Sequence, residues 1–150
     1  MSQDVSERQI RVSRILDSPI EISFEAWTKV EHLSKWWGPF GYTTKTDILN
    51  FKEGGNWTYQ MSHKEHGNFL NFIKYVEIKR NEKIVYDHSE TEDGPVLFRS
   101  CVTFENLGAK TRIQLLLEFP TKEACDAAKG HGEAGGKETL EKLNRYVSET

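Results

Sequence analysis

Residues 96–119, VLFRSCVTFENLGAKTRIQLLLEF, decide the fold of this chain. Apolar side chains alternate with more polar ones on both sides of the turn Asn106-Leu107-Gly108. Val96, Phe98, Val102 and Phe104 come before the turn, and Ile113, Leu115, Leu117 and Phe119 follow it. Alternation with a period of two is typical of strands with one dry and one wet face. Because the connection is short, the two strands must be antiparallel.

The same rhythm extends upstream through several turn-separated stretches. With the quoted hairpin, the pattern predicts six strands, over Thr43–Phe51, Asn56–Ser62, Asn68–Ile78, Lys83–Glu90, Val96–Phe104 and Lys110–Phe119. The turns between them are rich in Gly, Asn and Asp, so neighbouring strands form an antiparallel meander. The strand over 68–78 has apolar residues on both faces, so alternation does not tell which face points inward. Residues 9–16, QIRVSRIL, predict one further strand at the start.

Helices are expected before and after the meander in the sequence. Ser18-Pro19-Ile20-Glu21 and Thr28-Lys29-Val30-Glu31 read as capping boxes of two short helices, the second ending near Trp36-Trp37-Gly38-Pro39. Thr121 is expected to cap a short helix that ends near Lys129, and the glycine cluster after it reads as a hinge. Leu140, Leu143 and Val147 then mark the inner stripe of a terminal helix.

The resulting order, β-α-α-β6-α, predicts a single α+β domain over residues 1–150, with residues 1–7 disordered. One curved antiparallel sheet leaves the terminal helix as the element able to cover its concave face. A single helix does not fill a strongly curved sheet along its whole length. A cavity between the sheet and the C-terminal helix is therefore expected at one end.

Composition limits the classes of partner. Lys and Arg total 20 against 23 Asp and Glu, a net charge of −3, which disfavours nucleic acid as a partner. Two cysteines are too few for a disulfide scaffold. The opening residues do not resemble a signal peptide, and no apolar run approaches the length of about 18 residues that crosses a membrane. We therefore expect a cytoplasmic protein without membrane insertion.

The motifs that could carry catalysis or metal binding are weak. Gly130–Gly135 fits G-x-G-x-x-G, but no βαβ unit can follow it. His63 and His66 lie three residues apart beside Glu65, a spacing that metal ligands can have. Zinc is normally bound by three or four protein ligands, so a solvated turn explains these residues better. Cys101 has no base at a readable spacing. The sequence therefore predicts no catalytic residue, no metal and no cofactor.

The chain is rich in aromatic residues, with 4 Trp, 5 Tyr and 8 Phe, most of them between Phe24 and Tyr75. In this type of fold such residues can fill a core or form the wall of a cavity. We expect the wall to be formed by Trp37, Trp57, Tyr59, Met61 and Phe98, with Leu140 and Leu143 on the helix side. His88 shares its parity with Ile84 and Tyr86, so it is the candidate polar contact.

Residues 11–61 resemble the START-like superfamily, also called SRPBCC. Within it they resemble the branch named after the C-terminal domain of the activator of the ninety-kilodalton heat-shock protein ATPase. The resemblance rests on Ser18-Pro19, Ala26-Trp27-Thr28, Trp36-Trp37-Gly38-Pro39, Gly54-Gly55 and Met61, and Tyr75-Val76-Glu77-Ile78 and Thr111-Arg112 continue it.

This resemblance implies a helix-grip fold with a hydrophobic cavity, in a superfamily that binds lipids, sterols, polyketides or hormones and includes a few enzymes. One departure from the family pattern lies at the entry to the terminal helix. The family carries a Gly-Trp pair there, whereas this chain has Gly135-Gly136. We expect the missing indole to enlarge the cavity and place Gly136 in its wall.

The leading hypothesis is non-catalytic binding of a small hydrophobic or aromatic molecule. One alternative is an enzyme of cyclase or hydrolase type that uses the same pocket, with His88 as the first titratable candidate. Another is a co-chaperone-like interaction module, and a homodimer also remains open. An interaction module should show an exposed apolar patch.

Overall fold

The computed structural model describes residues 5–149. The elements run η1 (Val5–Arg8), β1 (Gln9–Leu16), α1 (Ile20–Glu25), α2 (Val30–Trp36), β2 (Tyr42–Leu49), β3 (Asn56–His63), β4 (Gly67–Lys79), β5 (Lys83–Ser89), β6 (Phe98–Asn106), β7 (Thr111–Glu118) and α3 (Lys122–Ser148). This α+β order confirms the predicted succession of strands and helices. Disorder was expected through residue 7, but residues 5–8 form a 3-10 turn, and residues 1–4 lie outside the described residues.

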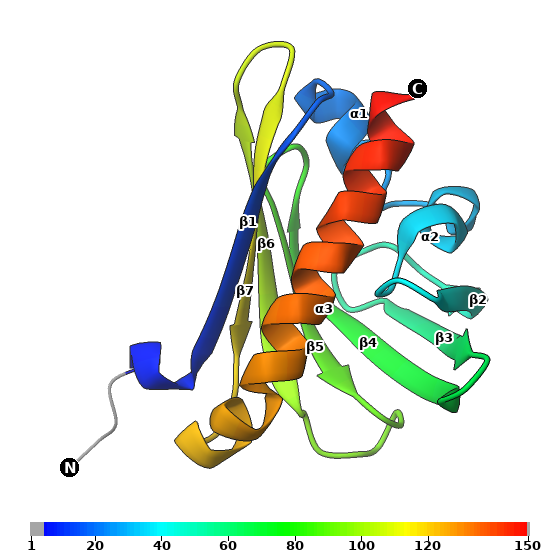
Figure 1. Ribbon diagram of the computed structural model, residues 1–150, viewed down its shortest axis with the longest axis vertical. Coiled ribbons are helices and arrows are strands. Elements are labelled where there is room, and N and C mark those ends of the chain that lie inside the picture. The colour runs from blue at the N-terminus through cyan, green and yellow to red at the C-terminus, as the bar shows by residue number, and fades with distance from the viewer. Residues whose placement is uncertain (1–4, 150) are drawn as a thin grey trace.

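All seven strands join one antiparallel sheet in the order β1-β7-β6-β5-β4-β3-β2. The first strand thus closes the sheet by pairing with the last. Bulges at Thr46/Ile48 and Tyr75/Glu77 interrupt the register, and bulges increase the bending and twist of a sheet. Helix α3 runs across one face of the curved sheet, and α1 and α2 lie near its C-terminal end (Figure 1). These features are those of the helix-grip fold.

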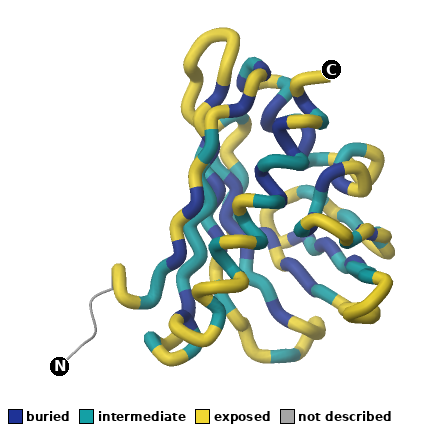
Figure 2. Tube along the Cα trace, in the orientation of Figure 1, coloured by how far each residue is buried: buried dark blue, intermediate teal, exposed yellow. Residues whose placement is uncertain are grey.

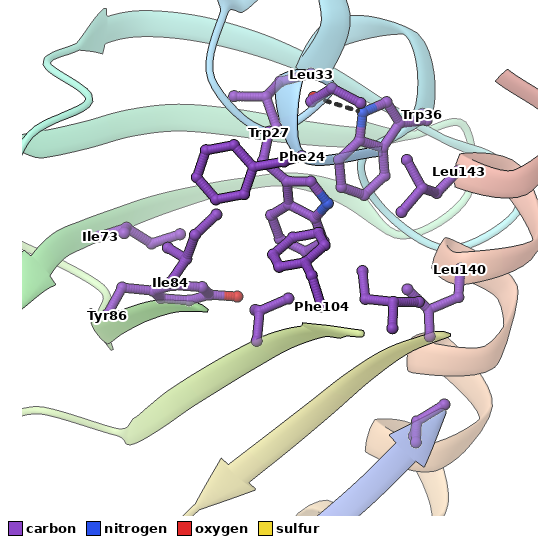
Figure 3. Packing of buried hydrophobic residues seen from close by; sticks show 14 of the residues in the cluster. Phe24, Trp27, Leu33, Trp36, Ile73, Ile84, Tyr86, Phe104, Leu140 and Leu143 are labelled. Atoms are coloured by element: carbon purple, nitrogen blue, oxygen red, sulfur yellow. Dashed lines mark hydrogen bonds between the residues drawn. The ribbon is translucent and has the colours of Figure 1, made fainter. Parts of the chain in front are cut away.

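The core lies between the sheet and these helices. Figure 2 shows buried segments in the middle of the strands and along the C-terminal part of α3, where Leu140, Leu143 and Val147 are almost inaccessible. Around them pack aromatic side chains of the helix pair and of the strands (Figure 3). Trp27 contacts Trp36 at 4.8 Å between ring centroids, and Phe24 contacts Phe104 at 5.2 Å. The helix pair thus caps one end of the sheet with aromatic rings.

Helix α3 differs from the prediction of a short helix, a hinge and a terminal helix. It is continuous from Lys122 to Ser148 and passes through all four glycines of the cluster. Each interior glycine costs about 1 kcal/mol relative to alanine, yet two of them face β1 at very short range. A Cβ built at Gly132 would lie 2.9 Å from Ile10 Cδ1, and one at Gly136 would lie 3.1 Å from Val12 Cγ2. Close packing on β1 offsets the low helix propensity.

The helix starts also differ from the predicted capping boxes. The N-cap residues of α1 and α2 are Pro19 and Lys29, and neither helix has a side-chain cap bond. Thr28 Oγ1 instead donates to the carbonyl of Glu25. At α3, by contrast, Thr121 accepts from the Ala124 amide at 3.1 Å, which confirms the predicted cap.

Candidate functional site

The register settles which side chains point toward α3. Strand β4, which alternation left undecided, faces inward with Phe69, Asn71, Ile73 and Tyr75, because Ile73 pairs with buried Trp57 and Tyr75 pairs with buried Tyr86. One end of this inner face is incompletely covered. There the inward side chains of Met61, Asn71, His88, Phe98 and Leu117 are only half-buried. These five residues, from β3 to β7, are called the inner row below.

His88 is the polar centre of the inner row. Its Nε2 lies 2.8 Å from Asn71 Oδ1, and the Asn71 amide nitrogen donates to the Phe69 carbonyl at 3.1 Å. The asparagine oxygen is therefore an acceptor, so Nε2 of His88 carries the proton and Nδ1 is left with its lone pair. No described residue hydrogen-bonds to this Nδ1. The ring also packs on Phe98 at 4.7 Å, and Phe98 on Phe119 at 5.3 Å.

Burial lowers the pKa of His88 from 6.5 to about 4, because the charged ring would lose its hydration without gaining a carboxylate partner. The imidazole is therefore neutral at physiological pH, a hydrogen-bond acceptor at Nδ1 and a weak base.

This lowered pKa predicts a loss of stability in acid. Between pH 6.5 and 4 the unfolded chain binds a proton at His88 and the folded chain does not, so protons favour unfolding in this window. Wild type should lose about 2 to 3 kcal/mol of unfolding free energy, relative to His88→Gln, as the pH falls from 6.5 through 4. Urea unfolding of both proteins at several pH values measures the difference. Parallel pH dependences would contradict the assignment.

Three buried tyrosines line the inner face beyond the row. Tyr59, Tyr75 and Tyr86 are each less than a tenth exposed. Burial raises the pKa of Tyr86 to about 12 and the pKa values of the other two above their usual range. Their hydroxyls are therefore protonated and neutral, and this part of the interior carries polar groups without charge.

The predicted wall residues fall into two groups. Trp57, Tyr59, Leu140 and Leu143 are buried in the core, whereas Trp37, Met61, His88 and Phe98 are half-buried. Trp37 connects the half-buried group with the buried one, because its ring centroid lies 4.8 Å from that of Trp57 and 6.0 Å from that of Tyr59. Asn71 and Leu117 are not among the residues that the sequence predicts for this site. Parity could have indicated Leu117, but Asn71 lies on the strand whose inner face alternation left open.

The expected enlargement at Gly136 is wrong. Val12 of β1 occupies the space beside this glycine, because the missing side chain lets α3 approach the strand. Gly136 thus serves helix packing rather than an additional void.

Three surface pockets lie mainly outside the inner row. One of about 210 Å³ is bounded by α1, α2 and the end of α3, with His32 and Tyr146 joined at 2.6 Å across it. A second of about 480 Å³ lies over β2, β3 and β4 and shares Asn71 with the row. The third, of about 270 Å³, shares only Phe98 with the row.

Within residues 5–149, no group of three or more His, Cys, Asp or Glu side chains is placed to hold a metal ion. In the same part of the chain, no helix is long and apolar enough to cross a membrane.

Comparison with known proteins shows that the fold is shared. Solved structures with the same fold include a protein of Nitrosomonas europaea (TM-score 0.86, 16% identity, 99% of each chain covered) and one of Arthrobacter aurescens (TM-score 0.87, 20% identity, 99% of this chain and 91% of that one). DynU16, from the dynemicin biosynthetic locus, matches with a TM-score of 0.72 and 15% identity over 93% of this chain and 47% of its own. No curated protein matches the sequence.

A family model supplies the assignment. The model described as Activator of Hsp90 ATPase homolog 1-like protein matches residues 17–148, which span α1 through the last residue of α3. This match confirms the resemblance seen in the sequence. The chain belongs to the family of Activator of Hsp90 ATPase homolog 1-like proteins.

Proposed function

We propose that the protein binds a small apolar or aromatic molecule at the inner row, without changing it chemically. The observation that carries the proposal is a row of inward-pointing but incompletely buried side chains around a neutral His88 whose Nδ1 has no partner among the described residues. Ligand sites are typically apolar surfaces with a few fixed polar groups. Met61, Phe98 and Leu117 supply the apolar contacts, and Trp37, Trp57 and Tyr59 support the wall behind them.

The polar groups favour a ligand that donates a hydrogen bond. Nδ1 of a neutral His88 accepts a hydrogen bond and repels a carboxylate lone pair. Arg14 shares the inner parity of Val12, yet its guanidinium is paired with Glu141 of α3. Lys142 of α3 lies near the carbonyls of Pro39 and Tyr42, and burial lowers its pKa. A neutral phenol or alcohol therefore suits the row better than an acid.

The same geometry argues against the enzyme alternative. A catalytic histidine needs a pKa near the working pH and is usually oriented by a carboxylate. His88 has a pKa near 4, and its partner is the amide of Asn71. Binding without turnover fits these properties better than hydrolysis or cyclisation.

Binding can be tested with three matched probes, naphthalene, 2-naphthol and 2-naphthoate, followed by tryptophan fluorescence and melting temperature. We expect 2-naphthol to bind tightest and 2-naphthoate weakest. His88→Phe should remove the roughly tenfold preference for naphthol over naphthalene, which corresponds to one hydrogen bond, and should retain naphthalene binding.

Val30→Ala, on the exposed side of α2, serves as a control that leaves all three affinities unchanged. The absence of binding by every probe, or an unchanged preference in His88→Phe, would contradict the proposal. Hydrolysis of a naphthyl ester that depends on His88 would favour the enzyme alternative instead.

A further inference from the structure

The outer face of the sheet carries a groove that the inner row does not explain. Its volume is about 480 Å³, and it lies over β2, β3 and β4 beside residues 90–92 of the β5–β6 connection. The outward side chains of Thr58, Gln60, Leu70 and Phe72 form its floor, because successive side chains of a strand alternate between faces and their neighbours in sequence, Trp57, Tyr59, Asn71 and Ile73, point inward. The helices lie on the opposite face (Figure 1). The floor of the groove and the inner row therefore lie on opposite faces of the sheet, and Asn71 is the row residue that also lines the groove.

Large apolar side chains in the groove are unusually open to solvent. Leu70 is 72% exposed and Ile48 is 47% exposed, while Phe72, two residues after Leu70 on β4, is buried. A single exposed leucine needs no explanation, but apolar side chains gathered in a groove with a polar margin are typical of interaction sites. Most of the Leu70 side chain is in contact with water. A macromolecular surface can cover it.

The margin of the groove is acidic. Asp47, Glu90 and Glu92 border it, and Lys45 is the basic side chain among the lining residues. None of the three carboxylates takes part in an ion pair among residues 5–149. Two other carboxylates on the outer face are compensated, since Asp87 pairs with Arg99 and Glu105 with Arg112. The groove thus combines an apolar floor with uncompensated negative charge.

The neighbouring sheet edge does not favour strand addition. Strand β2 ends the sheet, but the bulge at Thr46/Ile48 breaks its register, and Lys45 lies just before the bulge. Bulges and lysines at an edge discourage pairing with a further strand. A partner is therefore expected to lie on the face of β2–β4 rather than beside β2.

We propose that this groove is a docking surface for a segment of another protein that presents apolar side chains flanked by lysine or arginine. The apolar side chains would cover Leu70 and Ile48, and the basic ones would lie opposite Asp47, Glu90 and Glu92. Complementary charge of this kind steers association and makes it sensitive to salt. This inference goes beyond ligand binding at the inner row and does not depend on it.

The test uses the full chain and a fluorescently labelled amphipathic helical peptide made of leucine and lysine. Two companion peptides carry glutamate in place of each lysine, or serine in place of each leucine. Fluorescence anisotropy should show binding of the leucine–lysine peptide only, weakening as salt is raised. Leu70→Ser should raise Kd about tenfold, and the double variant Glu90→Gln/Glu92→Gln should raise Kd and flatten its salt dependence.

Matched controls separate the groove from the general negative charge of the chain. Leu107→Ser alters an equally large apolar side chain, 40% exposed, in the β6–β7 turn, and Glu31→Gln/Glu123→Gln removes two charges from α2 and α3. Both controls should retain wild-type Kd. Equal losses in the Leu70 and Leu107 variants, or binding of the leucine–glutamate peptide with equal affinity, would overturn the proposal. Binding of 2-naphthol is the independent measurement, and we expect it to be the same in all four variants.

Discussion

Replacing Trp36 by alanine is expected to lower the free energy of unfolding by about 4 kcal/mol, within the range of Trp→Ala substitutions in cores. The Trp36 side chain is inaccessible to solvent, and its ring packs edge-on against Trp27 and Trp37. Its Nε1 also donates to the buried carbonyl of Ala26 at 3.0 Å, as Figure 3 shows. The substitution leaves a cavity and an unpaired carbonyl at the point where α1 and α2 meet.

Urea unfolding followed by circular dichroism measures this effect, and two further variants give it a scale. Trp36→Phe keeps most of the volume and should lose less than half as much, mainly through the missing hydrogen bond, worth about 1 kcal/mol. Val30→Ala lies on the exposed side of the same helix and should change stability by less than about 0.5 kcal/mol. A Trp36→Ala loss as small as that of Val30→Ala would contradict the packing described here.

Introducing the family tryptophan at position 136 should destabilise this protein by about 3 kcal/mol, the upper part of the usual range for overpacking. Even a Cβ at Gly136 would lie 3.1 Å from Val12 Cγ2. Val12 is a β-branched residue held in β1 by pairing with β7, so it has little freedom to withdraw. An indole would have to push α3 away from the strand.

A second glycine of the same helix gives the opposite expectation. A Cβ at Gly130 would meet nothing within 4 Å, so Gly130→Ala should stabilise the protein by about 1 kcal/mol through helix propensity alone. Thermal unfolding of both variants provides the comparison. A Gly136→Trp protein as stable as wild type would mean that space exists beside α3 and would restore the idea of an enlarged cavity.

Strand alternation carried the prediction of the sheet because the two faces of β6 and β7 differ so clearly in polarity. Val102, Phe104 and Ile113 are buried where the pattern placed them. The alternation failed for β4, whose Leu70 and Phe72 are apolar but point outward. When both faces of a strand are apolar, the local sequence does not indicate which face the fold will bury. The outer groove was hidden from sequence reasoning for the same reason.

Helix boundaries were harder to predict, because tertiary packing outweighed local propensity. The glycines between Gly130 and Gly136 favour a break in an isolated helix, but contact with Ile10 and Val12 keeps α3 intact. The candidate site was predicted in part: the parity of His88 indicated its inward direction, whereas its bond to Asn71 depends on a pairing between strands. Hydrogen-bond partners on neighbouring strands are set by the register of strand pairing, which is established only when the chain folds.

Pairing between β1 and β7 affects how this protein can fold during its synthesis on the ribosome. Strands β2 to β6 can associate one after another as they emerge, because each pairs with its neighbour in sequence. Strand β1 is synthesised before them but has no partner until residues 111–118 exist, and Ile10 and Val12 stay uncovered until α3 follows. Nascent chains of intermediate length therefore expose an unpaired, partly apolar strand, the kind of segment that chaperones protect and that aggregates when they do not.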